Sequence, residues 1–593
     1  MSNAKGGARC CSVCVVPVAT SCAILSVYLT GAAGRMTDPF HANAAATHSV
    51  LRYLSQILDP AEFHTGHNPV AWQQAMRVLT GATIVRLILG AVVPLFPDEA
   101  YYWEWSRNLA AGYFDHPPVI ALLVRMGTTL FGDTPFGVRV VPILAGTGCA
   151  LAVVRIARAL GGDGAARLAA ILITVMPIVA AGAVLATPDA PMLCAAAWAL
   201  YAVLRALGLP EHAAGEDGPA DGRAALRWWI IAGIAIGIAM SSKYTSVLIP
   251  ASIALAFVFH GKLQNRFGQA GPYIAVAVAS LLMVPVLWWN ATHDWVSFQF
   301  QLSHGLGAPK GGALGALNRE IELFGGQVGL VSPILFWFLA RALRDAVRFS
   351  EEGFRLVVGL VCIVPLAFFV LSASRRSVEA NWPAMAWVAA VALLASDPPH
   401  SARARAWLAR GIVLAAVLSA IVYVHVVMPI VPIPPGRDQV AKAFGWDLVG
   451  EVVDRKLSAI RQGIGRGRSV PGSEIVYVAA ERYQDAAELA FHVTGHPKVY
   501  SLNLTGRANQ YDLWSQFRYD APLGATIVLV LDDQRDEPRV IRKLACCFNR
   551  IDESEGISLM RAGQLIERKR VWILSGKTDG WPSRDQPFLP PAP

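Results

Sequence analysis

The stretch Pro272–Trp289 reads PYIAVAVASLLMVPVLWW and contains no charged residue. A helix of roughly 20 apolar residues crosses the hydrocarbon core of a bilayer, and tryptophans favour its interface. Comparable runs recur along the chain and predict about eleven spans. Their approximate positions are 75–96, 137–157, 166–186, 190–207, 228–242, 245–260, 272–289, 324–342, 355–373, 382–396 and 410–431. The sequence therefore predicts an all-α polytopic membrane protein.

The composition of the 593-residue chain agrees with this interpretation. The chain is 54% hydrophobic and 16% charged, whereas soluble domains carry about 25% charged residues. Its formal net charge is +9, and arginines lie between the apolar runs. We interpret the basic excess as a signal of membrane topology and expect no nucleic-acid partner.

The distribution of Lys and Arg predicts which side each loop faces. If the span at 75–96 runs outward, the inner loops hold about twice as many Lys and Arg as the outer loops. Cytoplasmic loops favour these residues. We therefore expect an inner-membrane protein of a bacterium, with the outer loops and the segment after the last span in the periplasm.

Three regions are expected along the chain. Residues 1–69 are an N-terminal extension, and the apolar stretch 10–33 is either signal-like or the result of a start codon placed too far upstream. Residues 70–432 form the membrane domain. Residues 433–593 predict a small α/β domain, with strands at 474–478, 498–502, 525–531 and 571–574 and a helix at 483–493.

Acidic residues recur in the loops predicted to be outside, which suggests one active site on that face. Asp98 and Glu99 open the first loop, where Asp98 is a candidate general base, or both residues complement a helix N-terminus. Asp115 and His116 precede two prolines and suit a phosphate, a metal or an ordinary turn. Asp189 lies in a short link between two spans, where capping of the next helix is the alternative.

Cations occur in the same outer loops. Lys243, beside Tyr244, either neutralises a phosphate or extends to the membrane interface. Arg375 and Arg376 form either a cation site for a lipid-linked phosphate or a salt bridge with Glu379. Together these groups suit transfer from a lipid phosphate, because a carboxylate can take the acceptor's proton while cations hold the departing phosphate.

A transporter or flippase of lipid-linked sugars is the alternative function. A transporter would place broken helices and charged residues near mid-membrane. The polar clusters here lie in loops at one face. This placement favours an enzyme.

Taken in order, these motifs resemble those of bacterial family 39 glycosyltransferases, the relatives of protein O-mannosyltransferases and of the aminoarabinose transferase that modifies lipid A. The motifs are Asp98–Arg107, Asp115–Pro118, Gly132-Asp133 with Arg139, Thr187–Asp189, Ser242–Thr245, Trp289-Asn290 with His293, Asn381–Pro383 and the tail segment Phe491–Trp514. The resemblance covers about residues 70–540. It implies the GT-C architecture and an inverting transfer from a polyprenyl-phosphate sugar to lipid A, a glycan or a protein.

The resemblance also implies roles for individual residues. Asp98 matches the acidic residue thought to be catalytic, and Asp189 matches a second acidic residue at the same cavity. Asp115 and His116 match an acidic residue and a lysine, and that lysine contacts the donor phosphate. Since His116 replaces the lysine, neutralising the phosphate needs a protonated imidazole or charge from another residue, such as Lys243 or Arg375. A divalent metal at Asp115 and His116 also stays open. The expected substrate-binding residues are Glu99, Asp115, His116, Lys243, Tyr244, Arg375, Arg376 and Asn381.

Overall fold

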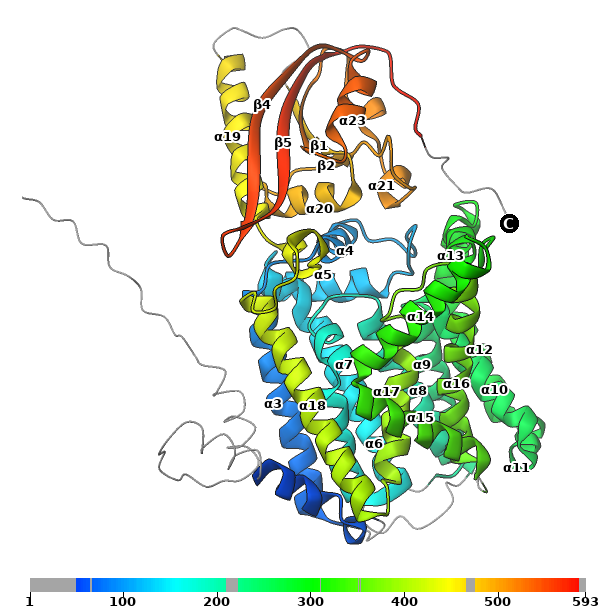
Figure 1. Cartoon of the computed structure of the whole chain (residues 1–593). Coiled ribbons are helices and arrows are strands. Elements are labelled where there is room, and N and C mark those ends of the chain that lie inside the picture. Colours follow the sequence, from blue (N-terminus) through cyan, green and yellow to red (C-terminus); the bar gives the residue numbers. More distant parts are fainter. Residues whose placement is uncertain are drawn as a thin grey trace, which may run out of the picture.

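The computed structural model describes residues 49–63, 67–209, 222–309, 311–349, 351, 353–465 and 475–585. A helical bundle carries a sheet domain on one end, and helices α4 (Pro97–Arg107) and α5 (Val119–Phe131) lie between the two (Figure 1). The predicted fold class, a polytopic helical protein with a small C-terminal α/β domain, is confirmed. The signal-like stretch 10–33 lies outside the described residues.

The apolar runs of the sequence form the bundle. Its longer helices are α3 (Pro69–Val92), α6 (Pro135–Val175), α8 (Asp189–Ala206), α9 (Gly222–Met240), α10 (Leu248–Phe259), α12 (Ala270–Ala291), α14 (Gly312–Val331), α15 (Pro333–Arg348), α16 (Phe354–Arg375), α17 (Ala384–Ser396) and α18 (Ala402–Val427). The shorter ones are η1 (Pro60–Glu62), α7 (Pro177–Gly182), η2 (Tyr244–Val247), α11 (Gly261–Gln264), η3 (Asn265–Gly268) and α13 (Val296–Leu306). Among the described residues, 6 helices are long and apolar enough to cross a membrane, or up to 8 if each of two bent pairs is one span. The chain is thus an integral membrane protein, and the figure of about eleven spans stays a prediction.

Three predicted spans differ in shape from the helices that the chain forms. The run 324–342 crosses Ser332, where α14 ends and α15 begins at an angle of 102°. Pro333 explains the break, because proline cannot continue the helix before it but suits the first turn of the next one. The runs 137–157 and 166–186 fall largely in α6, which is interrupted at Gly162 with φ 80°. Apolar composition alone does not predict these breaks.

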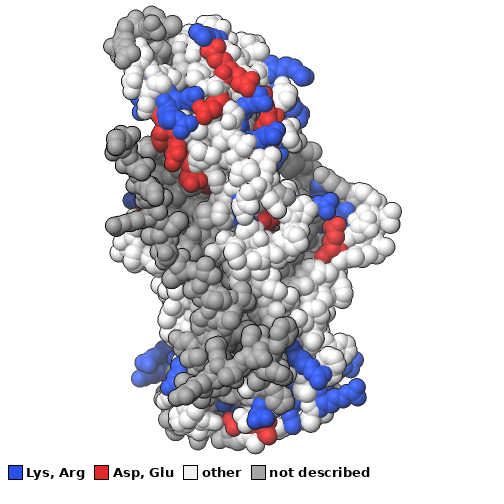
Figure 2. Space-filling model, turned by 60° about the vertical axis from the view of Figure 1, so that its left-hand side comes forward, with Lys and Arg blue, Asp and Glu red and all other residues white. Residues whose placement is uncertain are grey.

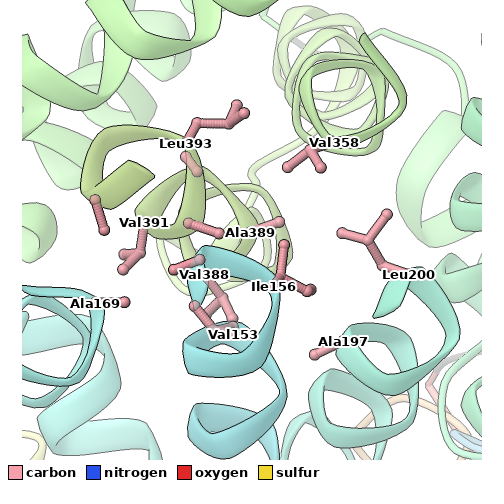
Figure 3. Packing of buried hydrophobic residues seen from close by; sticks show 14 of the residues in the cluster. Val153, Ile156, Ala169, Ala197, Leu200, Val358, Val388, Ala389, Val391 and Leu393 are labelled. Atoms are coloured by element: carbon pink, nitrogen blue, oxygen red, sulfur yellow. The ribbon is translucent and has the colours of Figure 1, made fainter. Parts of the chain in front are cut away.

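The core of the bundle lies where α6, α8, α16 and α17 meet. Figure 3 shows Val153, Leu200, Val358 and Val388 from these four helices turned toward one another. Every residue of α17 is buried, although the helix has only 13 residues. Small residues such as those of α17 let helices approach closely inside a membrane. The predicted span at 382–396 is therefore a short helix enclosed by its neighbours.

The C-terminal domain is a five-stranded sheet with helices. Its elements are η4 (Pro435–Arg437), η5 (Val440–Ala443), α19 (Trp446–Gly465), β1 (Val476–Ala480), α20 (Tyr483–His492), β2 (Val499–Ser501), α21 (Gln510–Leu513), α22 (Phe517–Asp520), β3 (Thr526–Asp532), α23 (Glu537–Leu544), β4 (Phe548–Arg561) and β5 (Gln564–Lys577). The strand order is β2-β1-β3-β5-β4, with β2, β1 and β3 parallel and β5 antiparallel to both of its neighbours. The four predicted strands and the helix α20 are present, whereas α19 and β4 were not predicted. β4 is an edge strand of mostly polar residues and lacks the apolar run by which strands were sought.

Two of the contacts that hold this domain on the bundle involve α20 and the β4–β5 hairpin. Helix α20 packs against α4. Arg561, near the tip of the β4–β5 hairpin, donates to the carbonyls of His425 and Val426 at the end of α18 and pairs with Asp438 at 2.5 Å. Because basic groups stabilise helix C-termini, Arg561 anchors the hairpin to the last membrane helix. The loops at this end of the bundle therefore face a fixed part of the C-terminal domain.

Charged residues lie mainly at the two ends of the molecule. On the face shown in Figure 2, Lys and Arg gather at the end of the bundle that is far from the sheet domain, while the described surface just above that end is white. A band without charges is what a lipid-facing surface requires. The picture agrees with the membrane assignment made from the helices.

Candidate active site

Asp98 lies in the first turn of α4 and faces the C-terminal domain. The Tyr483 hydroxyl donates to its Oδ1 at 3.5 Å. The residue keeps contact with solvent, yet partial burial of the carboxyl group and the nearby Asp115 raise its pKa, against smaller lowering effects of Arg507 and Tyr483. A carboxylate with a raised pKa is a stronger base, so Asp98 suits proton abstraction.

Glu99, the next residue, is enclosed by protein groups. Its carboxylate pairs with both Nε and Nη2 of Arg139, at 2.8 and 2.5 Å. It also accepts the backbone N–H of Phe96 at 3.0 Å and that of Ala186 at 2.7 Å. Of the two residues, Glu99 is the one that caps α4. The expectation that Glu99 binds substrate is corrected here, because its oxygens are occupied and it is buried.

Asp115 connects the loop before α5 to the C-terminal domain. Its Oδ1 pairs with Nη1 of Arg507 at 2.9 Å, and its Oδ2 accepts the Tyr101 hydroxyl at 2.9 Å. Tyr101 in turn accepts the backbone N–H of Gln510 at 2.7 Å. The side chain of Gln510 accepts the backbone N–H of Phe114 at 2.7 Å. The loop that precedes α5 is thus held by groups from residues 507–510.

His116 is electrically neutral in this arrangement. Burial, together with the charges of Lys243, Arg507 and His304, lowers its pKa to about 3. Its Nδ1 is buried and has no hydrogen-bond partner in the described part of the chain. Of the ways left open for neutralising a phosphate, a protonated His116 is therefore unsuitable at neutral pH.

Asp189 and Lys243 form an ion pair. The Lys243 Nζ lies 2.7 Å from Oδ1 of Asp189, and both side chains are largely buried. Asp189 occupies the first position of α8, while the capping position is taken by Pro188 without a side-chain hydrogen bond. The ion pair explains where both side chains lie. Capping of α8 by Asp189 and extension of Lys243 to the membrane interface are not needed to explain it.

Tyr102 shows that the three aspartates converge. Burial raises the pKa of its hydroxyl well above the ordinary value, and the charges of Asp98, Asp115 and Asp189 raise it further. All three carboxylates therefore act on one phenol. The segments that carry these aspartates therefore lie near one residue, and the single active site expected from the acidic residues stays a prediction.

An apolar cavity of about 720 Å³ extends from this site along the bundle. Tyr244, Gln301, His304 and Trp382 line one part of it, and mostly apolar side chains of α8, α9, α10, α12 and α16 line most of the rest. Gln301 donates to the backbone carbonyl of Asp115 at 2.6 Å, so this part of the cavity is its mouth toward the aspartates. Tyr244 accepts a hydrogen bond from Asn290 at 3.2 Å beside it.

Three further residues expected to bind substrate, Arg375, Arg376 and Asn381, lie in different surroundings. Arg376 is close enough to His304 to lower the pKa of that imidazole, after the larger effects of burial and Arg507. Its Nε is buried without a hydrogen-bond partner among the described residues. Arg376 therefore lies near His304 and beside Gly307, which follows the cavity-lining residue Leu306. Arg375 ends α16, and Asn381 is exposed before α17. Among the described residues, neither side chain forms a hydrogen bond or ion pair with the three aspartates.

The described residues do not fit a metal at Asp115 and His116. Both carboxyl oxygens of Asp115 are occupied by Arg507 and Tyr101. In the described ranges, no group of three or more His, Cys, Asp and Glu side chains is arranged to hold a metal ion.

Arg507 and Tyr483 were missed because the C-terminal domain was not expected to supply site residues. Arg507 lies 5.0 Å from the ring of Phe300 and 5.2 Å from that of Tyr483. Both residues are far in sequence from Asp98 and Asp115, so no local pattern joins them. The one available signal was the tail segment Phe491–Trp514, which contains Arg507 and was part of the resemblance.

This geometry can deprotonate a hydroxyl and hold an anion beside an apolar cavity. Asp98 is the aspartate of the three without an ion-pair partner among the described residues, since Asp115 has Arg507 and Asp189 has Lys243. Arg507, Lys243 and Arg376 supply positive charge nearby. A base beside cations and an apolar cavity suits a substrate that carries a phosphate on a lipid tail.

Known proteins resemble the chain in sequence. A family model described as dolichyl-phosphate-mannose-protein mannosyltransferase matches residues 115–289. Lipid A galacturonosyltransferase RgtD of Rhizobium johnstonii is 28% identical over 326 residues, which are 54% of this chain and 64% of that protein. An undecaprenyl phosphate-alpha-4-amino-4-deoxy-L-arabinose arabinosyl transferase of Pseudomonas aeruginosa is 27% identical over 311 residues, or 47% and 51% of the two chains. The match thus spans less than two thirds of either relative.

A solved structure shares the fold over most of the chain. The crystal structure of ArnT from Cupriavidus metallidurans in the apo state covers 84% of this chain and 97% of its own, with a TM-score of 0.56 and 15% identity. The structure of ArnT bound to undecaprenyl phosphate gives a TM-score of 0.53. At this identity, the likeness establishes a common architecture of bundle and C-terminal domain.

Proposed function

We propose that this chain, which has the sequence and fold of a GT-C glycosyltransferase similar to family 39, moves a sugar from a polyprenyl-phosphate donor to an acceptor hydroxyl at the membrane surface. The observation that carries the proposal is the position of Asp98. It is an aspartate without a cationic partner among the described residues, and it lies near Asp115, whose carbonyl accepts a hydrogen bond from the cavity-lining Gln301. The transporter alternative has no comparable use for such a base.

The cavity accounts for the donor's lipid. Its lining is apolar along α10 and α12 and becomes polar at Gln301 and His304. Burial of a polyprenyl tail in such a lining is favourable, because each buried methylene contributes about 0.8 kcal/mol. The tail would lie in the cavity and the phosphate at its mouth, beside Asp115 and Arg376.

The reaction follows from this placement. The oxygen of the acceptor hydroxyl attacks the anomeric carbon of the sugar, and its proton passes to the Asp98 carboxylate. The bond between the anomeric carbon and the phosphate oxygen breaks on the opposite face, so the configuration inverts. The phosphate leaves with the electron pair and gains one negative charge, which the cations at the mouth stabilise. Asp189 keeps Lys243 in place at 2.7 Å.

The names of the relatives support the choice of substrates. One relative is a lipid A galacturonosyltransferase, and another is named for an undecaprenyl-phosphate aminoarabinose donor. We therefore propose an undecaprenyl-type lipid phosphate as donor carrier and lipid A as the first acceptor to examine. Glycans and proteins remain the other acceptor classes.

We also propose that the site faces the periplasm of a bacterial inner membrane. The support is the excess of Lys and Arg in the loops at the opposite end of the bundle. A tag after residue 593 should then react with impermeant reagents in cells whose outer membrane alone is permeable. Labelling that requires access to the cytoplasm would contradict this orientation.

The enzymatic proposal is tested with the purified chain in nanodiscs, a polyprenyl-phosphate sugar and lipid A. The wild type should form a glycosylated product, and Asp98→Asn should lower the rate about 10²–10⁴-fold with unchanged thermal stability. The matched control is Asp447→Asn. It makes the same chemical change at an exposed aspartate of α19, which is far in sequence from Asp98. Near-normal transfer by Asp98→Asn would refute the role of Asp98. Movement of the donor across a bilayer without product would instead favour the transporter.

A further inference from the structure

We infer that Arg507, which the C-terminal domain carries into the membrane site, binds the phosphate of the donor. The inference rests on the proposed function. It adds Arg507, and with it the C-terminal domain, to the residues expected to bind the donor. Arg507 follows strand β2, more than 380 residues after Asp115, with which it pairs at 2.9 Å.

The first argument is position. The guanidinium group of Arg507 lies over the ring of Phe300 at 5.0 Å, and that ring stacks on His304 at 5.3 Å. His304 lines the mouth of the apolar cavity. The partner of Arg507, Asp115, is joined to the same mouth because its carbonyl accepts a hydrogen bond from Gln301. A phosphate at the end of a tail in this cavity therefore meets Arg507.

The second argument is the state of the neighbouring groups. His116 is neutral, since its pKa is lowered to about 3. Lys243 is held by Asp189 at 2.7 Å, and its side chain is only 11% exposed. The side chain of Arg507 is 43% exposed even though it pairs with Asp115. Of the two charged groups, Lys243 and Arg507, Arg507 is thus the one that an incoming anion can reach directly.

The third argument is the geometry of the donor groups. A guanidinium carries five N–H groups in a planar fork, which matches the oxygens of carboxylates and phosphates. In Arg507, Nη1 pairs with Asp115 and donates a hydrogen bond to the carbonyl of Ala508. Its Nη2 lies 3.4 Å from the Tyr483 hydroxyl. The remaining N–H groups can contact a phosphate while Asp115 stays in place. Asp115 is then a competing anion that weakens the binding.

The test measures binding of undecaprenyl phosphate and of undecaprenol, which has the same tail without the phosphate, to the full chain in nanodiscs. For Arg507→Gln we expect affinity for undecaprenyl phosphate to fall about tenfold or more, with affinity for undecaprenol unchanged. Arg507→Lys should keep part of the preference, because it retains charge but loses the fork. The control is Lys498→Gln, which removes an exposed cation of the same domain that pairs with Asp520 at 2.6 Å.

A second variant separates phosphate binding from a purely structural role. Asp115→Asn removes the competing anion, so affinity for undecaprenyl phosphate should stay equal or rise severalfold. If Arg507 only holds Asp115 in place, Asp115→Asn and Arg507→Gln will weaken binding alike, and the inference fails. Unchanged binding by Arg507→Gln would also overturn it while the proposed function stands. A wild type that does not prefer the phosphate over the alcohol would instead count against the proposed function itself.

Discussion

On the bundle side of the site, Glu99 and Arg139 form an ion pair whose side chains are 1% and 0% exposed, whereas on the domain side Arg507 reaches Asp115 with a side chain that is 43% exposed. The buried pair is surrounded by backbone donors and acceptors, and Arg139 also donates to the carbonyls of Val93 and Pro94. No ligand can enter it without leaving a charge unpaired. The open pair can exchange one partner for an incoming anion. The two acid–arginine pairs therefore differ in role. The buried pair stabilises the fold, whereas the exposed pair is open to a ligand, and the solvent exposure of the arginine is the difference between them.

The largest effect should come from breaking the buried pair. Glu99→Gln leaves Arg139 charged and without its counterion, and loss of one partner of a buried pair costs about 3–5 kcal/mol. Thermal unfolding of the purified chain should show a large loss of stability. The control Glu555→Gln removes an exposed pair with Arg455 and Lys456 and should cost less than about 1 kcal/mol. If Glu99→Gln and Glu555→Gln lost the same stability, the buried Glu99–Arg139 pair would not have the structural role assigned to it.

A smaller effect is expected where the two regions meet. Glu488 of α20 is 0% exposed, and both of its carboxyl oxygens lack a hydrogen-bond partner in the described chain. Burial raises its pKa from 4.5 to about 7, with smaller effects of His492, 3.4 Å away, and of the Glu99 and Asp485 charges. A raised carboxyl pKa means that folding favours the protonated form, so stability falls as the pH rises from about 5 through 7.

Glu488→Gln should therefore stabilise the chain at pH 8 by up to about 3 kcal/mol and change little at pH 5. Unfolding midpoints of wild type and variant across this range measure the difference. Asp447→Asn, on the exposed face of α19, serves as the control. A stabilisation that is the same at pH 5 and pH 8 would exclude titration of Glu488 as the cause.

The smallest effect concerns the pH dependence of transfer. Since Asp98 must be deprotonated to act as a base, kcat/KM should fall on the acid side, around a pKa above the ordinary aspartate value. The Tyr483 hydroxyl lowers that pKa, so Tyr483→Phe should move the acid limb to higher pH by less than about one unit. The rate at high pH should stay nearly the same. Tyr519→Phe alters an exposed tyrosine of the same domain and should leave the profile unmoved.

The bundle was largely predictable because membrane helices are selected for hydropathy, which composition reports directly. The run around Pro272–Trp289 is one continuous helix, α12, as expected. The run 324–342 was equally apolar but bends at Ser332, where the backbone φ of 82° and the following proline end one helix and begin another. Amino-acid composition indicates whether a segment prefers lipid. It does not indicate where the axis of a helix changes direction.

The site was predictable on its bundle side alone. Asp98, Asp115 and Asp189 stood out because they are carboxylates in the predicted outer loops, close to the ends of apolar runs. Glu99 carries the same chemical signal as Asp98, and only its contacts with Arg139 distinguish the two. Arg507 lies in a domain where charges are common, so its sequence surroundings gave no reason to select it. Contacts across hundreds of residues depend on how the domain docks, and no local pattern encodes this.

The hydrogen bond from the Gln510 amide to Tyr101 joins residues 409 positions apart. A ribosome that makes this chain releases the Asp98 loop into the membrane long before it has made Arg507. During that interval, the aspartates and the apolar cavity exist without the C-terminal side of the site. A nascent or prematurely terminated chain would thus insert its bundle without Arg507 and Tyr483 beside the aspartates.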